Sequence, residues 1–393
     1  MKHTDFVRNW LLRLALHLCA AALFALPGFS PLVSDMSGEY VYYRDNTFGR
    51  ESYIGFLMYD EGTYAARYAA PAVAAKKLPA QSVEILITID AGLPHFEMTG
   101  ERIVSPPSAD DREIINYLHT LMYEFHARRV KAGAVDESNV VFRKNGNFLR
   151  SGLALAEDFA QFGGDVTVIY DYLVPIFNIK AVERKPGRPD FYVVTAGRLA
   201  SSEDTAFDDF FGFPARYNDN RHVFQKPRGR GTEAVVMPDG QRFELDSRWS
   251  QSMENLWLCG DAALLSAGSI SGLTLPKSNG TSGPAALDAF PFVEPFLLRQ
   301  MLLSSGSSYV NWSSLVLSGL ENAERSCLIS AVFYQPKSGN ITQSARVLTP
   351  AGSDGYYFLT MTVFYNIYTK NKNYFEAILK SYSIEPPEPH GLQ

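Results

Sequence analysis

Short runs of aromatic and β-branched residues, separated by glycine and proline turns, constrain the fold of this chain more than any other feature. The clearest run, residues 83–90, places Val83, Ile85, Ile87 and Ile89 on one face of an extended strand. The 26 phenylalanines and 21 tyrosines suit such strands, because flat rings pack well on a pleated surface. The sequence therefore predicts antiparallel β-meanders.

Amphipathic helices are expected beside these meanders. One apolar stripe has helical spacing and consists of Ile114, Leu118, Leu121 and Phe125. A second stripe near the C-terminus consists of Phe375, Ile378, Leu379 and Tyr382. Residues 153–162, which end at a glycine pair, are expected to form a further short helix. The predicted class is α+β, with antiparallel β-meanders each packed by an amphipathic helix.

Two distant parts of the chain have the same predicted order of elements. Residues 51–129 and 326–383 each show strand, glycine turn, strand, proline, strand and helix. An internal pseudo-repeat would produce this order. Two independent meander-plus-helix units would produce it as well, and the sequence leaves both explanations open.

The first 34 residues have the composition of an export signal. Lys2, Arg8 and Arg13 precede an apolar core at residues 14–26, and Pro27 then interrupts the run. A cleaved signal would place the mature protein outside the cytoplasm, in a periplasm or secreted. An uncleaved anchor and a lipoprotein signal that uses Cys19 stay open as alternatives.

The rest of the chain divides by composition into four segments. We expect an N-terminal α+β domain at 38–199, an irregular linker at 200–232, a C-terminal α+β domain at 233–384 and a disordered tail at 385–393. The linker is proposed because residues 200–232 combine an acidic piece, an aromatic cluster and a basic loop.

Charge limits the classes of partner. The formal net charge is −6, and removal of the basic signal would make the chain more acidic. A chain with this charge lacks the overall positive electrostatic field that attracts nucleic acid. We expect no nucleic-acid partner, and contact with a membrane only through an uncleaved signal.

The cysteines do not define a metal centre. Without the signal, two remain, Cys259 and Cys327, and they allow either one disulfide or two buried thiols. No Cys/His zinc spacing, phosphate-binding loop or dinucleotide fingerprint occurs, so no metal or cofactor is predicted.

Three residues are weak candidates for catalysis. Asp90 and His95 flank the end of the strongest strand, and a turn between them could join them as a general acid–base pair. Asp261 follows an apolar strand and has no partner in sequence.

These observations favour an exported, non-catalytic envelope or secreted protein that binds a partner or surface component. Aromatic residues are enriched where proteins meet partners, and the aromatic run at 210–213 fits such a surface. One alternative is a hydrolase acting on an envelope polymer through carboxylates such as Asp90 or Asp261. Another is an outer-membrane-associated β protein, for which residues 356–368 would supply a strand.

Overall fold

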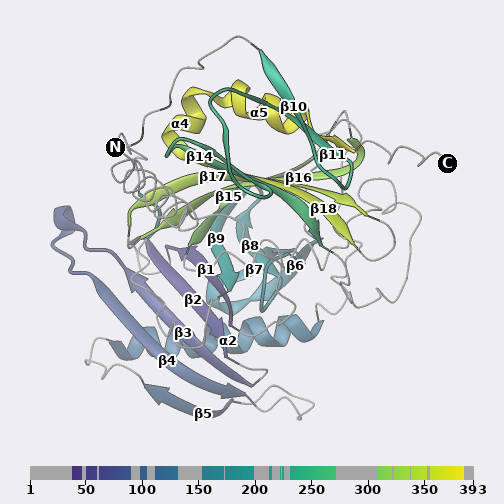
Figure 1. Ribbon diagram of the computed structural model, residues 1–393. Coiled ribbons are helices and arrows are strands. Elements are labelled where there is room, and N and C mark those ends of the chain that lie inside the picture. Colours follow the sequence, from purple (N-terminus) through teal and green to yellow (C-terminus); the bar gives the residue numbers. More distant parts are fainter. Residues whose placement is uncertain are drawn as a thin grey trace.

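The structure is a computed structural model that contains three antiparallel sheets (Figure 1). It describes residues 38–46, 50–59, 62–89, 98–103, 111–131, 153–171, 173–198, 212–214, 222, 224, 231–270, 308–320, 323–336, 338–351 and 355–384. The predicted export signal and the predicted C-terminal tail lie outside the described residues.

The N-terminal sheet has nine strands in the order β5-β4-β3-β2-β1-β9-β8-β7-β6. Two meanders therefore meet in the middle, where β1 pairs with β9. The strands are β1 (Glu39–Asp45), β2 (Ser52–Met58), β3 (Thr63–Ala70), β4 (Gln81–Ile89), β5 (Met98–Ile103), β6 (Leu153–Phe159), β7 (Gly164–Tyr170), β8 (Ile179–Lys185) and β9 (Arg188–Arg198). Two single turns of 3₁₀ helix, η1 (Ala74–Lys76) and η5 (Ala160–Phe162), lie between strands.

Helix α2 (Arg112–Lys131) packs against β3 and β4 of this sheet. Its Phe125 is fully buried, and its ring lies 5.6 Å from that of Tyr43 and 5.5 Å from that of Phe191. Arg128 joins the helix to β6, because its Nε lies 2.8 Å from Glu157 and its guanidinium lies 3.7 Å above the Phe159 ring. Aromatic burial and one buried ion pair thus hold α2 in place.

The C-terminal sheet has seven strands in the order β12-β13-β14-β18-β17-β16-β15. They are β12 (Ser250–Met253), β13 (Leu256–Cys259), β14 (Ala263–Ile270), β15 (Tyr309–Leu320), β16 (Ala323–Gln335), β17 (Asn340–Pro350) and β18 (Tyr356–Phe364). A small sheet of order β10-β11-β19 consists of β10 (Thr232–Val236), β11 (Gln241–Asp246) and β19 (Ser383–Ile384).

The sheets and helices form layers, which Figure 1 shows from the side. One cluster of buried residues runs from the N-terminal sheet onto one face of the C-terminal sheet, and β9 contacts β15. A second cluster joins the other face to the small sheet and to helices α4 (Tyr365–Lys370) and α5 (Lys372–Lys380). The C-terminal sheet is therefore apolar on both faces, and β17 is buried along most of its length.

The predicted α+β class is wrong, because the described chain is mostly β and its large sheets pack on each other. Residues 153–162 form strand β6 and a 3₁₀ turn rather than a helix. Register-matched pairing of β6 with β7 outweighs the local helix preference of Leu153 and Ala154. Long strands such as β15 and β16 add further β structure.

The two segments that a pseudo-repeat would relate belong to different sheets. Residues 51–129 contribute four strands and one long helix to the nine-stranded sheet. Residues 326–383 contribute strands to the seven-stranded sheet, two short helices and a strand of the small sheet. No comparison of the two segments tests the pseudo-repeat, which stays a prediction.

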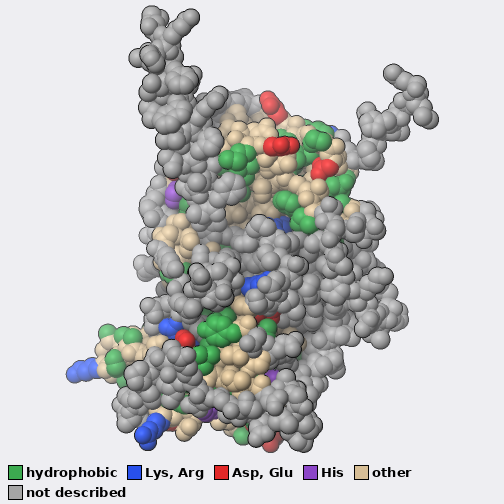
Figure 2. Space-filling model, turned by 60° about the horizontal axis from the view of Figure 1, so that its bottom comes forward, with side chains coloured by type: hydrophobic (Ala, Val, Ile, Leu, Met, Phe, Trp, Pro, Cys, Tyr) green, Lys and Arg blue, Asp and Glu red, His purple; other side chains and the backbone are tan. Residues whose placement is uncertain are grey.

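Within the described residues, no helix is both long enough and apolar enough to span a bilayer. On the face in Figure 2, the described Lys and Arg side chains stand apart from one another and form no continuous basic surface.

Candidate functional site

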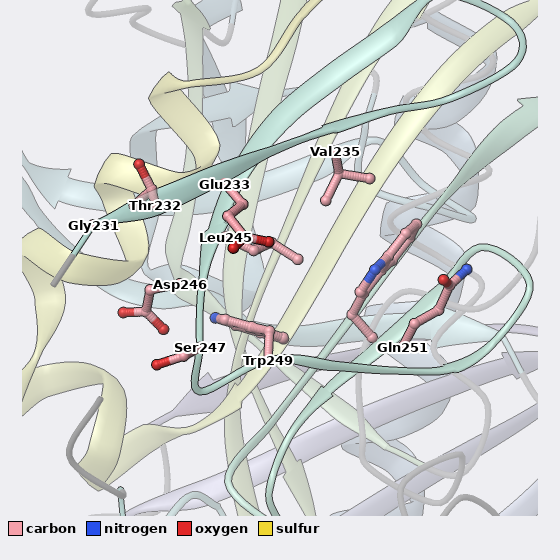
Figure 3. Close-up of a pocket in the computed structure, with 10 residues that line it drawn as sticks. Gly231, Thr232, Glu233, Val235, Leu245, Asp246, Ser247, Trp249 and Gln251 are labelled. Atoms are coloured by element: carbon pink, nitrogen blue, oxygen red, sulfur yellow. The ribbon is translucent and has the colours of Figure 1, made fainter. Parts of the chain in front are cut away.

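A groove of about 500 Å³ lies between the small sheet and the edge of the C-terminal sheet. It is lined by β10, β11, the turn at 247–249, β12 and β13, and we call it the β10–β12 groove. Figure 3 shows Asp246 and Gln251 at opposite ends, with Trp249 between them and Glu233 and Val235 above. Ligand sites in proteins are commonly concave, with apolar walls and a few polar groups.

The β10–β11 hairpin sets the upper wall of the groove. The turn is tight because Gly240 adopts a φ of 85°, and the Gly240 N–H donates to the Met237 carbonyl over 3.0 Å. The register pairs Glu233 with Leu245 and Val235 with Phe243. Directly paired residues share one face of a sheet, and so do residues two positions apart on one strand. The side chains of both pairs therefore point to the same face.

Two tryptophans form the apolar floor. Trp249 and Trp257 are 8% and 6% exposed, so each presents only a small part of its indole to a ligand. The Trp257 ring meets Phe243 edge-on at 5.1 Å. The Trp249 indole N–H donates to the Tyr374 hydroxyl over 2.7 Å and so ties the floor to helix α5. Both indoles of the floor are therefore held by contacts within the protein.

Asp246 closes one end of the groove as the centre of a polar network. It accepts hydrogen bonds from the Arg248 guanidinium, from the Arg248 N–H over 2.9 Å and from the Tyr374 hydroxyl over 3.2 Å. Burial tends to raise the pKa of Asp246, but the Arg248 bonds outweigh burial and hold the pKa below its ordinary value. The Arg248 guanidinium also lies 3.7 Å above the Tyr374 ring. The Asp246 carboxylate thus already has hydrogen-bond donors within the protein.

Glu233 is the unpaired acid of the groove. It is exposed, and within the described residues its carboxylate has no hydrogen bond or ion pair. Across residues 231–270 acids outnumber bases, and the only basic side chains are Arg242 and Arg248. Among the described residues, a ligand in this groove therefore meets one free negative charge, that of Glu233.

The structure places only one of the three predicted catalytic residues. Asp90 and His95 lie outside the described residues. Asp261 follows β13 and is exposed, and its Oδ2 lies 3.2 Å from Nδ1 of His222. The His222 ring stacks on Phe364 with centroids 3.6 Å apart. Sequence reasoning missed His222, because a histidine 39 residues before its partner leaves no spacing signal.

Cys259 and Cys327 are free, buried thiols rather than a disulfide. Cys259 lies in the cluster beside the small sheet, whereas Cys327 lies in the cluster between the two large sheets. Burial raises the pKa of Cys259 to about 12 and raises the pKa of Cys327 well above its usual range. Neither thiol is therefore a nucleophile at neutral pH.

A smaller hollow of about 230 Å³ lies at the end of β1, beside η5 and the β8–β9 turn. Arg184 and Asp190 line it and form a pair through two guanidinium–carboxylate hydrogen bonds of 2.9 and 2.7 Å. That pairing lowers the pKa of Asp190, chiefly through the hydrogen bonds from Arg184. Its charged groups already satisfy each other, so this hollow is a weaker candidate site. The described residues also contain no cluster of three or more side chains suited to a metal ion.

Comparison with known proteins yields two matches to protein-family models. Residues 38–208 match a model described as "Domain of unknown function (DUF7954)". Residues 233–383 match a model described as "Domain of unknown function (DUF7955)". The second match contains every residue of β10 to β13 that lines the β10–β12 groove, except Gly231 and Thr232 at its start.

No curated protein matches the chain. Among solved structures, the solution structure of cyanobacterial PsbP (CyanoP) from Synechocystis sp. PCC 6803 is similar over 44% of this chain and 100% of its own, with 9% sequence identity. The TM-score is 0.27, which is too low to relate the two folds.

Proposed function

We propose that this protein is exported, is not an enzyme, and binds a partner or surface component through the β10–β12 groove. The observation that carries the proposal is the form of the groove. A floor of Trp249 and Trp257, held by contacts within the protein, faces an upper wall that carries the carboxylate of Glu233, which has no partner among the described residues. Such a surface offers apolar contact area and one charge that can orient a ligand. Binding sites commonly combine these two features.

The export part of the proposal rests on residues 1–34, with their basic start and apolar core. Mass spectrometry of the mature N-terminus in the native host tests it. A new N-terminus near Ser34 supports release into a periplasm or the medium. A retained Met1 favours an uncleaved anchor, and a lipid-modified Cys19 favours a lipoprotein.

The binding part is tested by photo-cross-linking of the full-length protein in its native host. A photoreactive residue replaces Gln251, which lines the groove. The matched control carries the same residue at Leu155 of β6, which is 40% exposed and lies on the other large sheet. We expect a discrete adduct from position 251 that is absent from position 155.

A charge variant makes the result specific to the groove. Glu233→Lys reverses the free charge and leaves the floor intact, so the adduct at position 251 should disappear while the folded protein is still exported. If the adduct persists in Glu233→Lys, or if both positions give the same adducts, the groove is not the binding site.

A hydrolase acting on an envelope polymer is the second candidate, and the His222–Asp261 pair favours it. A carboxylate that orients an imidazole is a common general-base arrangement. The test is release of soluble fragments from purified envelope polymer of the host. Release by the wild type that Asp261→Asn abolishes would establish the enzyme and displace the binding proposal.

A further inference from the structure

Within the part of the chain that the structure describes, strand β10 has one unpaired edge. In the small sheet it pairs only with β11, and it stands at the end of the strand order. Within the described residues, no strand lies on its other side. A free edge offers a row of N–H and C=O groups to an incoming strand.

The register identifies which groups face outward. The Met237 N–H donates to the Gln241 carbonyl over 2.8 Å, so this is a hydrogen-bonded pair. Bonded and non-bonded pairs alternate in an antiparallel ladder, so Val235 and Glu233 are bonded to β11. Ala234 and Val236 therefore direct their N–H and C=O groups away from β11.

Side chains of the same strand line the groove, and Thr232 at its start lines the groove as well. Glu233 and Val235 line the groove, whereas Val236 points away from it and is 58% exposed. A strand added to this edge would continue the upper wall, and its own alternate side chains would enter the groove. Edge pairing and groove contact would therefore occur together.

The charge of the groove predicts which side chains of an added strand could face it. Within the described residues Glu233 has no hydrogen bond or ion pair, and acids outnumber bases across residues 231–270. Lys or Arg at one groove-facing position would pair with Glu233, and an apolar residue at the next would contact Val235. A strand with acidic residues at these positions would be repelled.

We propose that the partner is an extended polypeptide segment that adds as a strand to the free edge of β10 and directs a basic side chain toward Glu233. This inference rests on the proposed binding function and names the chemistry of its partner. Main-chain hydrogen bonds would supply much of the affinity in this mode, and the groove would select the alternate side chains.

The test begins with selection of displayed random linear peptides on the folded, full-length mature protein. Enriched peptides should be rich in β-formers, with one Lys or Arg placed two residues from an apolar residue. Binding of a synthesised winner is then measured by fluorescence anisotropy. Glu233→Gln should weaken binding and remove the preference for the basic residue.

Backbone pairing is tested separately from the groove. Ala234→Pro deletes an outward N–H that has no partner in β11, so the hairpin should still fold, which circular dichroism checks. Affinity should fall roughly tenfold, because one hydrogen bond is lost and the proline ring blocks close approach. In an added strand, every second peptide N–H faces β10. Methylation of these nitrogens should abolish binding, and methylation of the intervening nitrogens should leave binding intact.

The outcomes separate this inference from the proposed function. One result is that position 251 gives a groove-specific adduct while peptide affinity is unchanged by Ala234→Pro and by nitrogen methylation. That result would overturn strand addition and leave the proposed binding function in place. Absence of the adduct would overturn both. A dimer in light scattering that Ala234→Pro dissociates would mean that a second copy of this chain occupies the edge, and would overturn the basic partner.

Discussion

The Trp249 indole N–H donates to the Tyr374 hydroxyl over 2.7 Å, which joins the floor of the β10–β12 groove to helix α5. The same hydroxyl donates to Asp246 over 3.2 Å. A segment that follows the whole C-terminal sheet in sequence therefore holds one end of the binding surface. The shape of the groove depends on the docking of α5.

Tyr374→Phe tests this dependence. The variant leaves the buried Trp249 N–H without an acceptor, so the free energy of unfolding should fall by about 1–3 kcal/mol. Urea unfolding followed by tryptophan fluorescence measures the change. Tyr357→Phe on β18 is the control, because the Tyr357 hydroxyl makes no hydrogen bond within the described residues. Equal effects of the two variants would contradict the account.

The ion pair at Asp246 predicts a pH dependence of stability. Hydrogen bonds from Arg248 outweigh burial and lower the pKa of Asp246 in the folded state. Ionisation therefore stabilises the folded state above the unfolded pKa of about 3.9, and this contribution is lost as pH falls through the folded pKa. The difference in unfolding free energy between the wild type and Asp246→Asn should shrink as pH falls from roughly 5. A difference that stays constant over this range would refute the prediction.

Arg128 should be essential for the attachment of helix α2. Its Nε contacts Glu157 at 2.8 Å, and its Nη2 donates to the Asp158 carbonyl over 2.7 Å. Arg128→Met would leave Glu157 without its cation in a mostly buried position, at a cost of about 3 kcal/mol. Chemical denaturation measures this cost. Arg112→Met, on the exposed first turn of the same helix, should change stability little.

Gly212 marks a close approach of the central segment to the N-terminal sheet. It has a φ of 93°, and a Cβ at this position would overlap the Tyr53 ring. Gly212→Ala therefore combines backbone strain with a clash. Gly187→Ala is the matched control, because Gly187 has a φ of 74° and open space around it. In urea unfolding, Gly212→Ala should lower the free energy of unfolding more than Gly187→Ala does. Equal losses in the two variants would exclude the clash.

Local patterns predicted individual elements better than they predicted the class of the fold. The alternation at 83–90 corresponds to β4, and the stripe around Leu118 corresponds to α2, because side-chain period is a local property. Strand β6 was missed because its conformation depends on pairing with β7, and that pairing is not visible in its own residues. Strand pairing of this kind made the described chain mostly β.

The candidate site was less predictable than the strands. The groove brings together residues of four strands, and Tyr374 reaches it from 125 residues away. His222 meets Asp261 in the same way, through the fold rather than through a motif. In this part of the molecule, Pro238-Asp239-Gly240 is a local turn signal, because glycine tolerates the positive φ of the β10–β11 turn.

Amide hydrogen exchange along β10 tests the central claim most directly. In the free protein, the outward amides of Ala234 and Val236 should exchange much faster than the amides of Glu233 and Val235, which are bonded to β11. With a selected peptide at saturation, the outward amides should become protected. Outward amides that are already protected in the free protein, or that still exchange fast with the peptide bound, would contradict the account.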